Sequence, residues 1–276
     1  MGWVARPVPQ GISVPRPFRL FFLCGALAAL SFPGTAAAGE GCPKAGDEIA
    51  TDRPDVTNSS IVVPFGSLQS ENGVNASSRQ SPPIVDGTNS RLRLGVAPCL
   101  ELLVDLPTYV WATRGQASGG FTDTAPALKW QISPLPGKVD LSATFGVGLP
   151  TGASKIAGTG TQPYLQFPWS IELEHGWKIA GMATTFFHPS DPSNDLTQEA
   201  TFVLEREIGP HADLFVEYVG DFPAGAGGPS HMINSGGAFR FTPTQQIAFH
   251  VAMGLNHNAP SYVFGIGYSF RFDRLF

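Results

Sequence analysis

Apolar and polar residues alternate along most of the chain, in short runs separated by turn residues. The run 139–149 is the clearest, because Val, Leu, Ala or Phe fills every odd position and Asp, Ser, Thr or Gly fills every even one. The runs 165–174 and 247–256 repeat the pattern. A period of two places the two sets on opposite faces of a β-strand. The sequence therefore predicts an all-β protein.

The runs divide the chain into about twelve predicted strands of the length that a tilted membrane strand needs. Their connections alternate between tight turns and longer loops rich in Gly, Pro, Ser, Asn and Asp. This alternation is typical of a transmembrane antiparallel β-barrel with both termini in the periplasm. We predict such a barrel over residues 67–276, with strands near 67–75, 90–96, 99–105, 123–133, 138–148, 162–174, 176–187, 196–207, 211–220, 231–241, 246–255 and 261–272.

The last predicted strand carries the strongest pattern. Bulky apolar side chains stand at every second position from Tyr262 to Phe272. An unpaired edge of this kind aggregates in a soluble protein, whereas in a closed barrel it pairs with its neighbours and faces lipid. We expect it to close the barrel in the lipid of the outer membrane. The final residue, Phe276, resembles the C-terminal signal that the barrel-assembly machinery reads.

The N-terminus predicts export. Arg6, Arg16 and Arg19 precede an uncharged run over 20–30, and Ala36-Ala37-Ala38 follows. This order is that of a signal peptide, which we assign to residues 1–38. A transmembrane anchor fits less well, because the run is short and Pro33 and Gly34 follow it. Without these residues the chain holds 14 basic and 22 acidic residues and has a net charge of −8, which disfavours nucleic acid as a partner.

The polar set of the strands contains charges of both signs, which predicts a hydrated or hydrogen-bonded lumen. A soluble β-sandwich would instead turn its charges to water. Periodicity fits both, whereas the signal peptide, the aromatic face and Phe276 favour the membrane. The lumen candidates are Arg91, Arg93, Glu101, Asp105, Lys129, Glu172, Glu174, Glu205, Glu217, Arg240 and Arg271.

The segment 39–66 precedes the strands and lacks their period, so we expect a periplasmic or plug segment. Asp52, Arg53 and Asp55 would pair with charges of the lumen in a plug, with Arg53 binding carboxylates through its planar guanidinium. The alternative is a turn that holds the segment on the rim of the barrel. Cys42 and Cys99 remain after processing, and either a disulfide between them or two free thiols fits an exported protein.

The histidines suggest no metal site, because none has further ligands at metal spacing. His257 lies near Asn256, Asn258 and Ser261, a set that a lipid hydrolase could use. A loop or rim position is the simpler interpretation. No phosphate-binding or dinucleotide motif occurs, so no cofactor is expected.

Residues 51–73 carry a more specific signal. Thr51-Asp52-Arg53-Pro54-Asp55, with the later Val62-Val63-Pro64 and Gly66, resembles the start of a bacterial family labelled for a meta-pathway of phenol degradation. Gly148-Leu149-Pro150-Thr151-Gly152 and the run 265–272 are also similar to that family. The chain departs from it at residues 95–101, where Pro98 and Cys99 replace a polar turn. The resemblance implies an outer-membrane barrel associated with uptake of small, often aromatic, compounds.

These observations favour a passive outer-membrane channel for small molecules, hydrophobic or aromatic ones among them. About twelve strands lie between the filled barrels of eight strands and the open porins of sixteen. We therefore expect a pore that is narrow or blocked by residues 39–66. A barrel enzyme acting on lipids and a structural or adhesive surface barrel are the alternatives.

Overall fold

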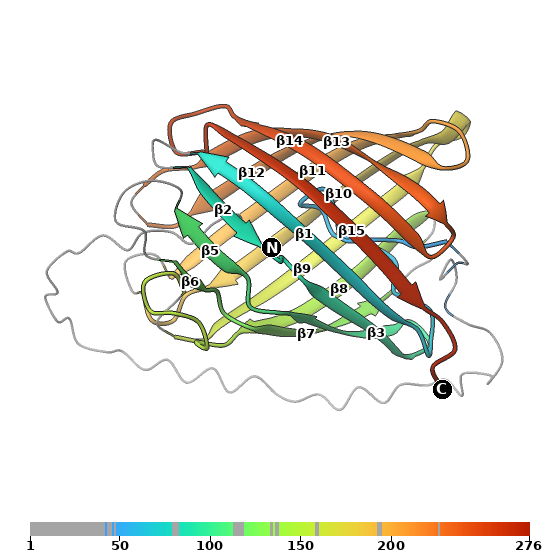
Figure 1. Ribbon diagram of the computed structural model, residues 1–276, viewed down its shortest axis with the longest axis horizontal. Helices are drawn as coiled ribbons and strands as arrows, with labels where there is room; N and C mark the ends of the chain where they lie inside the picture. The colour runs from blue at the N-terminus through green and yellow to red at the C-terminus, as the bar shows by residue number, and fades with distance from the viewer. Residues whose placement is uncertain are drawn as a thin grey trace, which may run out of the picture.

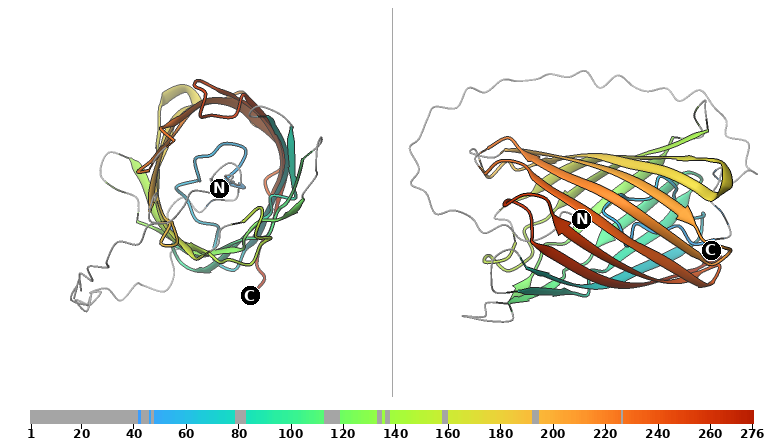
Figure 2. Two further views of the ribbon diagram at one scale, coloured as in Figure 1. Left: turned by 90° about the vertical axis from the view of Figure 1, so that its left-hand side faces the viewer. Right: turned by 90° about the horizontal axis from the view of Figure 1, so that it is seen from above.

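The computed structural model describes residues 42, 46, 48–78, 83–112, 119–132, 135, 138–157, 160–191, 195–225 and 227–276. They form a closed antiparallel β-barrel, seen from the side in Figure 1 and along its axis in the left view of Figure 2. The predicted signal peptide, residues 1–38, lies outside the described residues.

The wall of the barrel is one sheet of antiparallel strands, in which neighbouring strands are hydrogen-bonded. In chain order they are β1 (Leu68–Ser78), β2 (Ile84–Gly87), β3 (Arg91–Ala97), β4 (Leu100–Asp105), β5 (Tyr109–Ala112), β6 (Gly120–Phe121), β7 (Ala125–Gln131), β8 (Val139–Gly148), β9 (Gln162–Glu172), β10 (Trp177–Phe187), β11 (Leu196–Glu207), β12 (Ala212–Pro223), β13 (Ser230–Thr242), β14 (Gln245–Gly254) and β15 (Tyr262–Phe272). A 3-10 turn, η1 (Glu174–Gly176), joins β9 to β10.

Three pairs of short strands each make one passage through the wall. β3 pairs with the first half of β1 and β2 with the second half, so β2 and β3 are two parts of one strand. In the same way β4 continues into β5, and β6 continues into β7. The 15 strands therefore give 12 passages, which confirms the predicted barrel of about twelve strands.

The barrel closes between its first and last strands. β1 pairs with β15 along its whole length, from Leu68 opposite Phe272 to Ser78 opposite Tyr262. The prediction that the aromatic run 261–272 closes the barrel is confirmed. The first strand, which has little apolar alternation, is held by the ladder hydrogen bonds that this pairing supplies.

Side chains on the strands alternate between an apolar outside and a polar inside. On β14 Phe249 is 56% exposed, whereas the adjacent His250 is 2% exposed. Trp111 and Trp177 lie on the outer surface near opposite ends of their passages, as the aromatic residues of a membrane interface do. An apolar exterior around a polar interior excludes the soluble sandwich and suits a barrel surrounded by lipid.

Within the described ranges no helix is long and apolar enough to cross a membrane.

The strand boundaries differ from the predicted ones mainly in β2, β5 and β6, which the sequence pattern placed in loops 76–89 and 106–122. These strands have four, four and two residues, so they are too short to show a period. The predicted strand 162–174 ends earlier, at Glu172, because Glu174 to Gly176 form the turn η1.

Candidate functional site: the lumen and the segment it encloses

Residues 48–66, called the lumenal segment below, lie inside the barrel, as the blue trace in Figure 2 shows. Near its start the amide of Ile49 donates to the carbonyl of Pro243 at 2.7 Å, in the turn between β13 and β14. Near its end the amide of Gly66 donates to the carbonyl of Gly95 at 2.9 Å, close to the turn between β3 and β4. Both ends therefore lie at the opening that carries the tight turns, and the middle of the segment is surrounded by strands.

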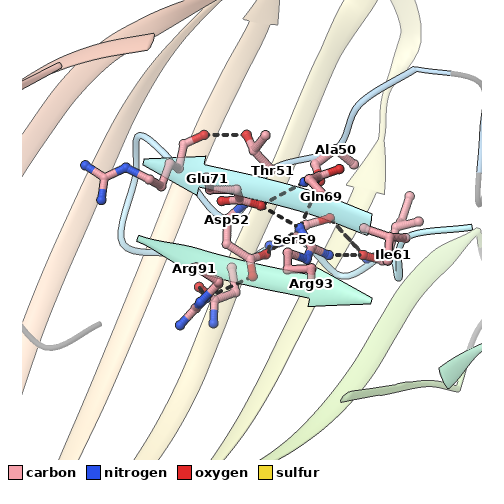
Figure 3. Close-up of polar contacts among 12 residues, drawn as sticks. Ala50, Thr51, Asp52, Ser59, Ile61, Gln69, Glu71, Arg91 and Arg93 are labelled. Carbon is pink, nitrogen blue, oxygen red and sulfur yellow. Dashed lines mark hydrogen bonds and ion pairs between the residues drawn. The ribbon is translucent and has the colours of Figure 1, made fainter. Parts of the chain in front are cut away.

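Asp52 is the centre of an ionic network between the lumenal segment and the wall made by β1, β3, β4 and β7. Its carboxylate lies 2.9 Å from Nη1 of Arg91, 3.3 Å from Nη1 of Arg93 and 3.5 Å from Nζ of Lys129. Figure 3 shows Gln69 and Glu71 on one strand and Arg91 and Arg93 on the neighbouring strand, on either side of Asp52. The Asp52 side chain is almost fully buried, which makes these contacts stronger than ion pairs in water.

The wall fixes the cations through carboxylates of its own. Arg91 makes two contacts with Asp105, at 2.6 and 3.0 Å. Arg93 binds Glu101 at 3.0 Å and Glu71 at 3.0 Å. Planar guanidinium groups bind carboxylates in this paired geometry. Buried charges need partners, so these wall carboxylates allow the two arginine side chains to be buried.

The charges around Asp52 control its ionisation. Burial by itself raises the pKa of the carboxyl group, but Arg93, Lys129 and Arg91 outweigh that effect and hold the pKa well below its usual value of 3.8. The amide of Ser59 also donates to Asp52 at 2.8 Å. Asp52 is therefore a carboxylate throughout the neutral pH range.

The opposite wall, made by β10 to β13, binds the backbone of the segment through Glu217. Its carboxylate accepts hydrogen bonds from the amides of Val56 and Thr57, at 3.0 and 2.9 Å, and from the Thr57 hydroxyl at 2.8 Å. Asn234 donates to the same carboxylate at 2.9 Å. Glu217 thus satisfies two amides of a buried segment that has no secondary structure to do so.

Asp55 faces this second wall and has the opposite electrostatic environment. Burial raises its pKa, and the nearby carboxylates of Glu217 and Glu205 raise it further, which places the pKa well above its usual value. Lys178 offsets this only in part, because it pairs with Glu205 at 2.9 Å. Two carboxyl groups of one segment, three residues apart, therefore ionise very differently.

The returning half of the segment is bound by backbone contacts. The amide of Val62 donates to Gln131 at 3.0 Å and the amide of Val63 donates to Glu101 at 2.7 Å. The segment then passes so close to β3 that a Cβ at Gly95 would lie 2.1 Å from the carbonyl oxygen of Pro64. Glycine at this position is what permits the close approach of the two backbones.

Arg53 does not bind wall carboxylates as predicted. Among the described residues its guanidinium makes no ion pair with them, and its Nε has no hydrogen-bond partner. It lies instead over the inner side of β1 and β15, where a Cβ at Gly73 would be 2.4 Å from Nη2 and one at Gly267 would be 3.3 Å from Nε. Burial lowers its pKa. The pairing role that we assigned to Arg53 belongs to Asp52, because the cations and carboxylates of β1 to β7 converge on that residue.

A disulfide joins Cys42 to Cys99 in the turn between β3 and β4. The lumenal segment is continuous with β1 at its other end. Cys42 and Gly66 are therefore both attached to the side of the barrel that carries the tight turns.

A family model described as "Putative MetA-pathway of phenol degradation" matches residues 51–272. The chain belongs to this family. The match begins at Thr51, so it includes most of the lumenal segment as well as the strands. No curated protein matches the chain by sequence.

Solved structures share the fold. The COG4313 outer membrane channel from Pseudomonas putida F1 has a TM-score of 0.60 and 13% sequence identity, over 80% of this chain and 100% of that one. A NanC porin has a TM-score of 0.51 and 11% identity, over 74% and 98% of the two chains. A KdgM porin solved with disordered oligogalacturonate has a TM-score of 0.50 and 9% identity, over 75% and 99%. The fold is thus that of outer-membrane barrels.

Most of the predicted lumen residues lie on the inner face of the barrel. Arg91, Arg93, Glu101, Asp105 and Lys129 form the network around Asp52. Glu205 and Glu217 line the second wall, while Arg240 and Arg271 lie at the turn end, with Arg240 bound to Asp213 and Arg271 to Asp273. Glu172 is exposed at the end of β9. Glu174 is exposed in η1 and is not part of a strand, so its predicted place on the lumen face is wrong.

Several inner residues were missed because they are uncharged or lie in the weakly patterned first strand. Glu71 and Gln69 are fully buried on β1, while Gln131, Gln166, Asn234 and His250 are buried on later strands. Their signal was present, since each stands at the inward parity of its strand.

His250 and His257 lie in different parts of the barrel. His250 lies 3.2 Å from Asn234 and 3.3 Å from Asn75 inside the lumen. His257 is exposed in the connection between β14 and β15. No cluster of metal-binding side chains occurs within the described part of the chain.

Proposed function

We propose that the protein is an outer-membrane channel that lets small molecules cross passively, hydrophobic or aromatic compounds among them. The observation that carries the proposal is a closed barrel with an apolar exterior and a charged lumen, which contains one continuous segment of its own chain. The family description, with its reference to phenol degradation, supports the class of compound. Lumen charges such as Arg91, Arg93 and Lys129 would set selectivity.

The lumenal segment would act as the plug. It occupies the middle of the barrel, and it contacts β1, β3, β4, β7, β9, β11 and β12 through side chains that include Glu71, Ser170, Thr201 and Glu217. A segment held by so many hydrogen bonds closes the pore until those bonds are exchanged for others. Transport would then require local displacement of residues 48–66 and no change in the barrel itself.

Conductance in planar bilayers tests the proposal. The native protein, in which Cys42 and Cys99 are paired, is compared with a variant that lacks residues 39–66 and carries Cys99→Ser, so that neither protein has a free thiol from this pair. We expect brief or small openings from the full chain and a stable, larger conductance from the shortened one. Folded protein that gives no conductance and no solute flux in either form would contradict a channel and favour a structural barrel.

A catalytic role is not part of the proposal. Detergent-dependent hydrolysis of a lipid ester that His257→Ala abolishes would contradict this view, because it would show that the exposed histidine is a functional base.

We further propose that the C-terminus takes part in membrane insertion. Phe276 packs against Phe65 with their ring centres 5.4 Å apart, and the amide of Leu275 donates to the carbonyl of Gly66 at 2.8 Å. Deleting Phe276 should lower the fraction of heat-modifiable, inserted protein more than the conductance of the molecules that insert. Normal insertion of the shortened protein would remove the assembly machinery from the proposal.

A further inference from the structure

The wall around Asp52 has the composition of a site for a carboxylate. Three cations from β3 and β7 converge on one carboxylate group, at 2.9, 3.3 and 3.5 Å. That carboxylate belongs to a segment outside the sheet, so the barrel and its occupant are separate partners in this contact. The Asp52 side chain beyond Cα is chemically an acetate group, which means that the wall already binds a small carboxylate.

The site keeps its form without Asp52. Arg91 is oriented by its two contacts with Asp105, and Arg93 by Glu71 and Glu101. Lys129 also lies 3.5 Å from Glu101. The three cations and these three carboxylates of the wall balance, so that one added carboxylate restores the charge seen in the closed barrel. A site of fixed, buried cations loses little entropy when it binds a ligand.

We propose that Arg91, Arg93 and Lys129 form a binding site for small organic carboxylates, and that Asp52 occupies it in the closed barrel as an internal substitute for the ligand. An external carboxylate that takes the place of Asp52 releases one attachment of the lumenal segment. This inference rests on the proposed channel function in one respect only, which is that such carboxylates would be the molecules transported. Binding itself is a property of the folded barrel.

Asp55 supplies an internal control. It belongs to the same segment and is also surrounded by the barrel, but its neighbours include the carboxylates of Glu217 and Glu205. Removing the Asp55 carboxyl leaves a space without the three cations. An external carboxylate should therefore replace Asp52 and should not replace Asp55.

Chemical rescue in detergent tests the site on the full chain. The unfolding midpoint of Asp52→Ala and Asp55→Ala is followed with sodium formate, which matches the carboxylate that alanine lacks, with sodium chloride at equal ionic strength and with neutral formamide. We expect formate alone to raise the midpoint of Asp52→Ala in a saturable way, with no such shift for Asp55→Ala. Equal responses to formate and chloride, or equal responses of the two variants, would overturn the proposal.

A second measurement uses the native protein and holds if Asp52→Ala does not fold. Hydrogen exchange of the Ser59 amide, which donates to Asp52, is measured with benzoate and with uncharged benzamide. We expect benzoate, and not benzamide, to speed the hydrogen exchange of this amide, and Lys129→Gln to reduce the effect. Equal rates with the two compounds would refute the replacement of Asp52 by an external carboxylate. A barrel that binds carboxylates yet conducts nothing would leave this site in place and would refute the channel.

Discussion

The two walls that hold the lumenal segment differ in the charged groups that they present to it. The wall of β1, β3, β4 and β7 presents three cations to the carboxylate of Asp52, besides the carboxylates of Glu71 and Glu101, which accept backbone amides. The wall of β10 to β13 presents a carboxylate, Glu217, to backbone amides of Val56 and Thr57. The first contact depends on the side chain at position 52, whereas the second is made mainly by backbone amides, with one added hydrogen bond from the Thr57 hydroxyl.

This difference indicates which contact determines how the segment sits in the barrel. Backbone amides repeat at every residue, so Glu217 alone would allow the segment to slip by one position. A single carboxylate among three cations allows only one arrangement. We infer that the first wall defines the register of the segment and that the second wall adds affinity.

The largest effect is expected from removing Arg93. Its side chain is fully buried and contacts Asp52, Glu71 and Glu101. Arg93→Ala would leave three buried carboxylates without their shared cation, and breaking a buried pair in this way costs about 3–5 kcal/mol. Urea unfolding of the inserted or detergent-bound protein measures the loss.

Arg240→Ala is the matched control for this prediction. Arg240 pairs with Asp213 at the turn end and lies 3.6 Å from Glu48, which is itself 66% exposed. Arg240 is more exposed than Arg93, whose side chain is fully buried, so we expect a smaller loss from Arg240→Ala than from Arg93→Ala. Equal losses from the two arginine variants would show that the two regions do not differ as the structure indicates.

The disulfide should produce the next largest effect, because it fixes the segment to the first wall only. Cys42 and Cys99 are 57 residues apart, and a crosslink of typical loop length stabilises a fold by about 2–4 kcal/mol. Cys99→Ser should lower the free energy of unfolding by that amount and lengthen channel openings, while dithiothreitol reproduces the effect in the native protein. If neither changes the openings, Asp52 and Glu217 suffice to hold the segment.

The sequence predicted the barrel well because the period of two repeats in most of the long strands. The period of two in β8, β11 and β14 marked the inner and outer faces, and the charged inner positions could be named from it. The short strands β2 and β5 were not predicted, because four residues are too few to show a period.

The network around Asp52 could be predicted only in part. The pattern identified Arg91, Arg93, Glu101 and Lys129 as inward residues, but not that they meet. Their convergence depends on the pairing of β3 with β4 and of β4 with β7, and on a segment without secondary structure. The motif Asp52-Arg53-Pro54-Asp55 suggested that Arg53 forms the pairs, because arginine is the usual partner of carboxylates. The barrel supplies the arginines instead, so the segment contributes the acid.

The finest test of the comparison is the pH dependence of Asp52→Asn and Asp55→Asn. The pKa of Asp52 is lower in the folded protein than its usual 3.8, so the folded state binds fewer protons. Its contribution to stability is complete above about pH 4 and is lost as the pH falls.

The pKa of Asp55 is raised, so its contribution is complete at acid pH and declines as the pH rises through the raised pKa. The charged groups around Asp52 are Arg91, Arg93, Lys129 and Glu71, and those around Asp55 are Glu217, Glu205 and Lys178. Asp52→Asn should therefore cost about 1–3 kcal/mol at neutral pH and flatten the acid side of the stability profile. Asp55→Asn should cost little and remove part of the alkaline decline, as urea unfolding between pH 3 and pH 9 would show. Parallel profiles for the two asparagine variants would mean that the two walls exert the same field on the segment, and the distinction between them would fail.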